Sequence, residues 1–295
     1  MKKPHTYILS VLLTLIVIFS LLGLAGASLL RFKALNPATF TQIVNEKALP
    51  ARVQDELRSY FKEQENASGI PASVYDKAIA EGQLRPIIQD TVSNAFDYLN
   101  GKTDTLGITP DFSVLNADMT AFFEQYAADN GYEKDALYDE TLAKAVKAGS
   151  ENIQSACDVF RIGLLDQAGL LKKVRRVMPY LSYALFGALV MLVLAVILLV
   201  TVNRREKHEV CYWVGTAVLV SSLLMLVPAA YLQATSWFDR FAVKSDQVFA
   251  AVTGYLYKMT GTVITGAVIG LVLAVCLYLL RGVTRSRKRR PVPAA

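Results

Sequence analysis

Four long apolar blocks constrain this chain more than any other feature of its sequence. They comprise residues 7–30, 180–202, 210–232 and about 260–280, and none of them contains Asp, Glu, Lys, Arg or His. Each block approaches the roughly 20 helical residues that are needed to cross a hydrocarbon core about 30 Å thick. The blocks also explain why the chain is 53% hydrophobic and only 19% charged. The sequence therefore predicts four transmembrane helices in contact with the lipid bilayer.

The first block has a second interpretation. Lys2 and Lys3, the apolar stretch and Ala25-Gly26-Ala27 together resemble a secretory signal peptide with its cleavage site. The apolar core, from Tyr7 to Leu24, is longer than the roughly 7–15 residues of a cleaved signal. This length favours an uncleaved signal anchor. Cleavage would leave three spans and would not change the side on which the following domain lies.

Basic residues near the spans predict the orientation of the chain. Four spans place the N-terminal tail, the 203–209 loop and the C-terminal tail on one side of the membrane. These segments contain eleven Lys and Arg, against three in the loop of about 233–259 on the other side. Because short cytoplasmic loops carry the excess of positive charge, both termini are predicted to be cytoplasmic and residues 31–179 extracytoplasmic. The predicted location is the cell membrane, with several passes.

The segment between the first two spans is expected to form six or seven packed helices. Apolar residues recur in it at intervals of three and four, and no run alternates with a period of two, so no strand is predicted. The run that begins at Leu84 stops at Asn100-Gly101, and the next ends at Asn130-Gly131. A weaker helical run, from Leu137, is expected to end near Gly149.

The predicted fold class is all-α, a bundle of four transmembrane helices with an all-helical extracytoplasmic domain inserted between the first and second spans. Pro228 is expected to kink the third span or to mark its outer end. The expected organisation is residues 1–30 for the tail and first span, 31–179 for the domain, 180–280 for spans two to four, and 281–295 for a basic, disordered cytoplasmic tail.

The charge of the outer segment is layered. Residues 34–171 contain 21 Asp and Glu against 11 Lys and Arg, so the body of the domain is acidic. Six basic residues lie next to the spans and form a predicted basic collar: Arg31, Lys33, Lys172, Lys173, Arg175 and Arg176. Basic residues near a membrane attract anionic lipid headgroups. Contact of the collar with an acidic protein partner is the alternative.

Several kinds of chemistry lack the residues they need. The two histidines, His5 and His208, lie outside the outer domain, which excludes a Ser–His or Cys–His pair and a histidine-containing zinc site there. Cys157 is the only cysteine of that domain and is expected to be a buried apolar residue, with a link between two protomers as the alternative. No phosphate-binding or dinucleotide-binding motif is present. The sequence thus predicts no catalytic residue, no metal, no cofactor and no enzyme.

The net charge of +6 does not predict binding to nucleic acid, because much of it lies in the C-terminal basic run beside a span. The span cores contain no ionisable residue of the kind that marks an ion or proton pathway. Gly266 and Gly270 form a GxxxG motif, which allows helices to approach closely. We expect this motif to serve packing within the bundle, with homo-oligomer formation as the alternative.

The order of one span, a large outer domain and three further spans is similar to that of permease subunits of export-type ABC systems. That resemblance implies an ATPase partner bound at the 203–209 loop or the tails. Two features depart from it, an N-terminal tail too short for a coupling helix and an outer domain that is all-helical.

The sequence favours a non-enzymatic membrane protein whose outer domain binds a partner or ligand, as a sensor, scaffold or accessory protein. A permease-like or accessory subunit of a transport or export complex, with a protein partner in the membrane, is the alternative. A membrane enzyme that uses a metal or outer-domain carboxylates, such as Asp104 or Asp111, is a third hypothesis.

Overall fold

The computed structural model describes residues 4–107, 110–204 and 206–287. The described residues contain no β-strand, which confirms the prediction of an all-helical chain. The chain divides into two compact units. The first contains the described residues up to Asn36, then Val177–Arg240, and those from Leu256 onward; the second contains Pro37–Arg176 and Phe241–Tyr255.

Helices of the first unit are mostly long and apolar. They are α1 (Pro4–Leu29), the short π-helix η1 (Leu30–Ala34), α8 (Leu170–Val202), α9 (Lys207–Ala234), the short 3-10 helix η3 (Trp237–Arg240) and α10 (Asp246–Arg287). The first residues of α8 and of α10 belong to the second unit. The remaining helices form the second unit: α2 (Pro37–Glu46), α3 (Leu49–Ser68), the 3-10 helix η2 (Ala72–Tyr75), α4 (Glu81–Leu99), α5 (Ser113–Asn130), α6 (Ala136–Cys157) and α7 (Ile162–Gln167).

Four helices are long and apolar enough to cross a membrane, as the sequence predicts. They lie within Thr6–Ala34, Leu170–Val202, His208–Ala234 and Asp246–Thr284. Large apolar side chains on them are exposed, among them Phe19 at 70% and Phe186 at 68%. Such side chains are stable in contact with lipid tails, so the exposed surface is that of a multi-pass membrane protein.

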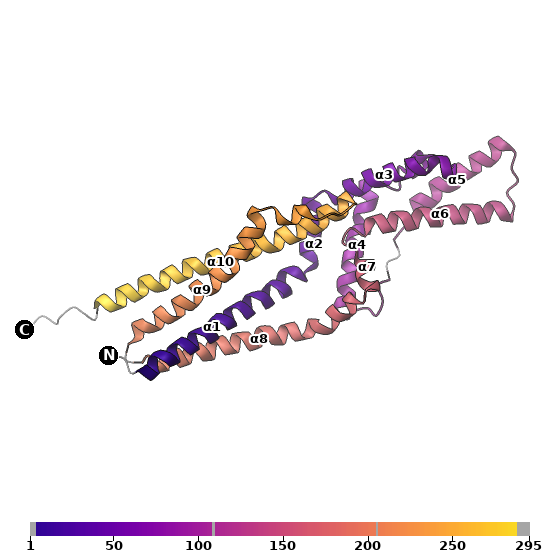
Figure 1. Cartoon of the computed structure of the whole chain (residues 1–295). Helices are drawn as coiled ribbons and strands as arrows, with labels where there is room; N and C mark the ends of the chain where they lie inside the picture. Colours follow the sequence, from indigo (N-terminus) through magenta and orange to yellow (C-terminus); the bar gives the residue numbers. More distant parts are fainter. Residues whose placement is uncertain (1–3, 108–109, 205, 288–295) are drawn as a thin grey trace, which may run out of the picture. The chain divides into compact units, whose positions relative to one another are not determined.

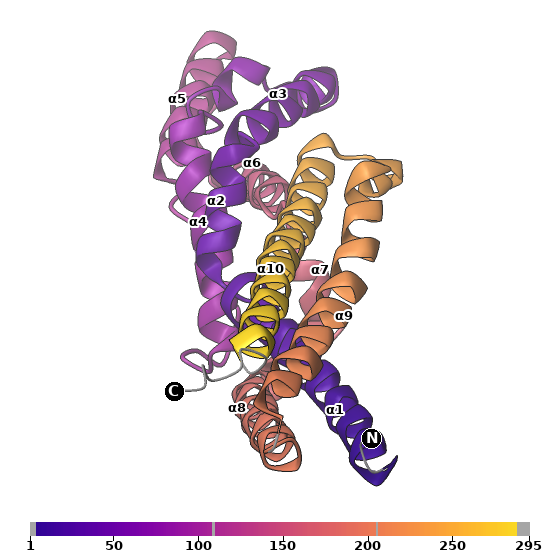
Figure 2. The ribbon, with the colours of Figure 1, turned by 90° about the vertical axis from the view of Figure 1, so that its left-hand side faces the viewer.

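The core of the first unit lies among α1, α8 and α9. Val17, Leu199 and Ala217 are fully buried there, and α1 packs along α9 (Figure 2). Lipid tails are as apolar as these side chains, so packing the helices together gains little hydrophobic free energy. Close packing and polar contacts are therefore the expected source of their association.

Three side-chain contacts place four helix ends together at one end of the first unit (Figure 1). The Tyr7 ring meets the Trp213 ring with centroids 5.5 Å apart, which joins the starts of α1 and α9. The amide of Asn203, directly after α8, donates to Ser10 Oγ at 3.2 Å. Arg281, near the end of α10, contacts Glu209 at the start of α9. Consecutive spans must alternate in direction. The starts of α1 and α9 therefore lie at the same end as the ends of α8 and α10.

The second unit has a separate core, formed where the apolar faces of α3 to α6 meet. Val53, Leu57 and Phe61 recur at four-residue intervals along α3 and are all buried. Phe61 stacks on Tyr75 of η2 with ring centroids 3.7 Å apart. Val44 of α2 belongs to the same core, and α2 packs on α4 (Figure 2). The helical periodicity of the sequence therefore identifies the buried face of α3 through these three residues.

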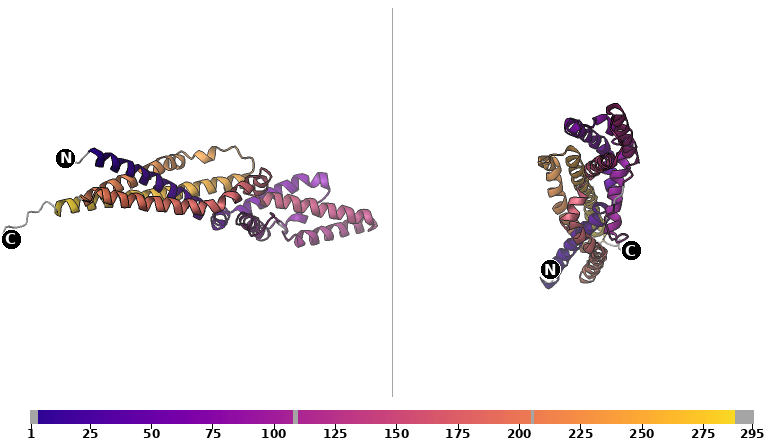
Figure 3. Two further views of the ribbon diagram at one scale, coloured as in Figure 1. Left: turned by 90° about the horizontal axis from the view of Figure 1, so that it is seen from below. Right: turned by 90° about the vertical axis from the view of Figure 1, so that its right-hand side faces the viewer.

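Helices α5 and α6 form a hairpin within the second unit (Figure 3). Helix α5 ends at Gly131, whose φ of 68° favours glycine. Helix α6 runs to Cys157, so the prediction that it ends near Gly149 is wrong. A Cβ atom at position 149 would lie 3.1 Å from Tyr75 Cε1, and the glycine therefore permits close packing inside the helix instead of ending it.

The start of α10 contributes to the core of the second unit, which was not predicted from the sequence. Residues 233–259 were predicted to form a loop and about 260–280 the span, whereas the helix begins at Asp246. Ala251 is fully buried in the core, and Tyr255 packs on Phe40 with ring centroids 5.1 Å apart. Asp246 also forms an ion pair with Arg52 of α3. The second unit is therefore made of two separate stretches of chain.

Two further expectations concern helix ends. Helix α9 continues past Pro228 to Ala234, so this proline does not mark the end of the helix. Helix α10 continues to Arg287, so residues 281–287 are helical where a disordered tail was expected. Residues 288–295 of that tail, and Lys2 and Lys3 at the other terminus, lie outside the described residues.

Candidate ligand-binding site

The basic collar is divided between the two units. Arg31 and Lys33 lie in η1 of the first unit, and the other four residues lie on α8 in the second unit. Five of the six side chains are exposed: Arg31, Lys33, Lys172, Lys173 and Arg176. These five remain available for the lipid contact that the sequence predicts.

Arg175, the sixth member of the collar, is held within the second unit. Its Nη2 donates to Asp104 Oδ1 at 3.1 Å, and its guanidinium lies 4.7 Å from the centre of the Tyr98 ring. The side chain of Arg175 is 29% exposed. This arginine therefore joins α8 to α4 and to the loop after α4, a structural role that the sequence did not reveal.

Of the two glycines in the GxxxG motif, one lies at a helix contact. A Cβ at Gly270 would collide with Ser222 Oγ of α9. A Cβ at Gly266 would meet no atom within 4 Å. Within the first unit, the motif thus supports packing of α10 on α9 through Gly270 alone.

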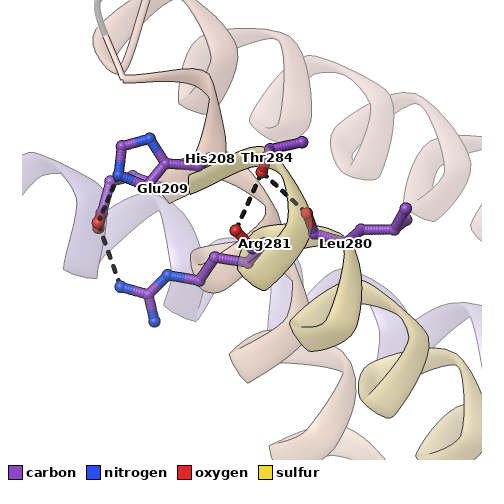
Figure 4. A network of polar contacts seen from close by, with 5 residues as sticks. All are labelled: His208, Glu209, Leu280, Arg281 and Thr284. Carbon is purple, nitrogen blue, oxygen red and sulfur yellow. Dashed lines mark hydrogen bonds and ion pairs between the residues drawn. The ribbon is translucent and has the colours of Figure 1, made fainter. Parts of the chain in front are cut away.

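A polar network joins α9 and α10 at the common end of the first unit (Figure 4). Arg281 Nη2 donates to Glu209 Oε1 at 3.2 Å, and His208 Nε2 lies 3.5 Å from the same oxygen. The Arg281 guanidinium also lies 4.1 Å from the centre of the Tyr212 ring. Both members of the ion pair are partly buried, with side chains 26% and 17% exposed for Arg281 and Glu209.

This network includes potential metal ligands. One ligand atom from each of Glu206, His208 and Glu209 lies within 4.8 Å of the others. The guanidinium of Arg281 contacts the Glu209 oxygen that a cation would need, and its positive charge opposes cation binding there. The arrangement is best suited to fixing the start of α9 to the end of α10.

One hollow of the second unit lies between α5, α6 and the loop that joins them. Its volume is about 320 Å³, within the range of small-molecule sites. Four aromatic rings line it: Phe123, Tyr126, Tyr132 and Tyr138. Two carboxylate residues, Glu133 and Asp135, also line it, together with Ala127, Leu137 and Thr141. We refer to this hollow as the aromatic pocket.

The rings of the aromatic pocket form two pairs. Tyr126 and Tyr132 are nearly parallel, with centroids 6.0 Å apart and an interplanar angle of 10°. Phe123 and Tyr138 meet at 77° with centroids 6.2 Å apart. Tyr126 is 49% exposed and Tyr132 is 63% exposed, so both side chains are accessible to a ligand and neither is buried in the core.

The carboxylates differ in their existing contacts. Asp135 Oδ1 accepts a hydrogen bond of 2.9 Å from the Tyr138 N–H and so caps the start of α6. Glu133 makes no hydrogen bond or ion pair with any residue in the described part of the chain. Lys134 Nζ donates to Glu124 Oε1 at 2.9 Å, and this bond raises the pKa of Lys134. The lysine is therefore already paired.

Other candidate reactive groups are used structurally. Cys157 is 1% exposed, which confirms its expected burial, and burial, aided by the charge of Asp158, raises its thiol pKa to about 12. Asp111 accepts the Ser113 N–H, which lowers its pKa. Asp104 is paired with Arg175. A general acid needs a raised carboxyl pKa, and Asp111 has the opposite shift.

The aromatic pocket was not predicted from the sequence. The pattern before Asn130-Gly131 predicted only a helix that ends there, and it indicated no binding role for Tyr126, Tyr132 or Glu133. The sequence signal that could have identified the site is the density of Tyr, Asp and Glu on both sides of the Asn130-Gly131 helix stop.

In comparisons with protein-family models, with curated proteins and with solved structures, nothing matches this chain. Its functional inference therefore depends on the residues of the chain itself.

Proposed function

We propose that this protein is a non-enzymatic integral membrane protein whose helical domain binds a ligand or a protein partner outside the cytoplasm, as a sensor, scaffold or accessory protein. The observation that carries this proposal is the aromatic pocket, an accessible hollow with ring faces and carboxylates at the surface of the second unit. Aromatic walls with a few polar groups are typical of binding sites.

The proposed orientation has both termini in the cytoplasm. It is supported by the excess of basic residues in the tails and the 203–209 loop. It is also supported by contacts among the described ends of the four long helices, which lie together at one end of the first unit. In this orientation the aromatic pocket is open to the outside of the cell.

Photo-cross-linking from the pocket tests the binding function. A photoreactive phenylalanine analogue would replace Tyr126 in the full chain, and the adduct formed in native membranes would be identified by mass spectrometry. The control carries the analogue at Lys62, an exposed position of α3. We expect a defined adduct at position 126 and none at 62. The absence of any adduct specific to position 126, or chemical conversion of a captured compound by the purified protein, would contradict the proposal.

A permease-like or accessory subunit of a transport or export complex is the second candidate function. Helices α8 and α10 each supply residues to both units without a break in the helix, so either could transmit motion along its axis. Mild cross-linking in native membranes, followed by purification of the tagged protein, tests this role. A stoichiometric cytoplasmic ATPase would support it, whereas recovery of the protein alone would favour a self-contained binding protein.

A further inference from the structure

We infer that the aromatic pocket binds an organic ammonium cation. This inference rests on the proposed function, because it names the ligand class of the same site. Ring faces carry partial negative charge and attract ammonium groups that lie within about 6 Å of the ring centre. The pocket presents several rings around one hollow of about 320 Å³, which accommodates a compact alkylammonium group.

The accessible faces of Tyr126 and Tyr132 provide the first part of the site. These rings stack on each other at 6.0 Å, which fixes their orientation without burying them. Exposed tyrosines of this kind gain little from folding alone, since Tyr126 remains 49% and Tyr132 63% exposed to water. An ammonium group bound beside these rings would gain cation–π attraction that a neutral ligand lacks.

The negative charge around the pocket is the second feature of the proposed site. Residues 124–140 contain six Asp and Glu and one Lys, so the tip of the hairpin is strongly acidic. That lysine, Lys134, is paired with Glu124, and it does not line the pocket. Glu133 does line the pocket and has no partner among the described residues. A cation entering the pocket therefore meets an unpaired carboxylate and a favourable field.

The arrangement fits an organic cation better than a metal ion. Divalent cations such as Ca²⁺ take six to eight oxygen ligands, while the lining of the pocket supplies the carboxylates of Glu133 and Asp135. One oxygen of Asp135 already caps α6. Within the described ranges, the only set of three potential metal ligands is the one at Glu206, His208 and Glu209. Aromatic rings, whose faces attract organic cations, make up four of the nine residues that line the pocket.

Calorimetric titration of the purified full chain tests the inference with a matched pair of probes. Choline carries a quaternary ammonium group, and 3,3-dimethylbutan-1-ol is its neutral carbon counterpart of the same shape. We expect choline to bind about tenfold more tightly than the alcohol. This ratio lies between the cation–π attraction typical of an exposed site and that typical of a desolvated site. Equal binding of the two probes, or no binding of choline, would overturn the inference.

Substitutions locate the binding to the pocket. Tyr126→Phe retains the ring and should retain choline affinity, whereas Tyr126→Leu should lose about tenfold. Glu133→Gln should weaken choline and leave the neutral alcohol unchanged. Because Tyr126 and Glu133 are exposed, these variants should fold, and circular dichroism with a thermal scan checks that they do. Equal choline affinity in Tyr126→Leu and Tyr126→Phe would also overturn the inference.

The ammonium group could belong to a free solute or to a lipid headgroup. Repeating the titration in nanodiscs of phosphatidylglycerol, with and without phosphatidylcholine, separates these sources. Competition by phosphatidylcholine would assign the cation to a lipid, and unchanged choline binding would assign it to a solute; both results support ammonium recognition. Failure of choline to bind, combined with a neutral adduct captured at position 126, would overturn this inference and leave the proposed function standing.

Discussion

Burial sets the reactivity of Cys157. Its thiol is 1% exposed and its pKa is raised to about 12, first by burial and then by the charge of Asp158. Because the thiolate is the nucleophile, we predict that a maleimide at pH 8 leaves Cys157 unmodified in the native protein and modifies it after unfolding. Mass spectrometry of a Cys211→Ala/Cys276→Ala background would measure this single thiol. Rapid labelling of the native chain would show that Cys157 is accessible and would contradict its burial.

The same burial predicts a loss of stability at alkaline pH. The folded state favours the neutral thiol, so the stabilisation is present below the ordinary pKa of 9.0 and decreases as the pH rises toward about 12. Burial also raises the pKa of Tyr75, which acts in the same direction above its ordinary value of 10.0. We expect Cys157→Ala to reduce the fall in melting temperature between pH 8 and pH 10.5 without abolishing it. An identical fall in both proteins would contradict this assignment.

Tyr138 illustrates a different effect of burial. Its hydroxyl oxygen is buried and has no hydrogen-bond partner among the described residues. A buried polar group without a partner is destabilising by about 1–3 kcal/mol. We predict that Tyr138→Phe, which removes only this hydroxyl, leaves the protein as stable as before or stabilises it by about 1 kcal/mol. The melting temperature would report this change, and a clear decrease would indicate that the hydroxyl has a partner in solution.

Helices were largely predictable from the sequence, but the contacts between them were not. The run from Leu84 to Phe96 gave the buried face of α4 because its apolar residues recur at helical intervals. Gly149 was interpreted as a helix stop because a sequence does not distinguish a terminal glycine from one that admits a neighbouring Tyr75 ring. Phe123 of α5 and Tyr138 of α6 are brought together only when the α5–α6 hairpin closes. No local pattern encodes that meeting.

The two glycines of the GxxxG motif provide a matched test of element packing. Gly270→Ala places a methyl group against Ser222 Oγ, whereas Gly266→Ala places one in open space. We predict that Gly270→Ala destabilises the protein by about 1–3 kcal/mol, the usual range for overpacking, and that Gly266→Ala has little effect. Thermal unfolding in detergent would measure both. Equal destabilisation by the two variants, with loss of an oligomer, would instead assign the motif to contacts between copies of the chain.

At the scale of the whole molecule, the segments rich in basic residues flank the helix ends that lie together in the first unit. The four apolar blocks were sufficient to predict four long membrane-type helices. The second unit's use of residues 241–255 was not predictable, because that segment follows a polar loop and its buried alanines carry little hydropathic signal. Since α10 contributes to both units, the fourth span and the domain that precedes the second span are covalently linked by one helix.

The orientation of the whole chain in the membrane can be tested directly by cysteine labelling. In a background with Cys157, Cys211 and Cys276 replaced by alanine, single cysteines would be introduced at Lys62 and at Arg204, both exposed. We expect an impermeant maleimide to label position 62 in intact cells and position 204 only after permeabilisation. The reason is electrostatic: eleven basic residues in the short segments on one side, against three on the other, favour retention of the richer side in the cytoplasm. The opposite labelling pattern would place the aromatic pocket inside the cell, where its ligand would have to be a cytoplasmic amine.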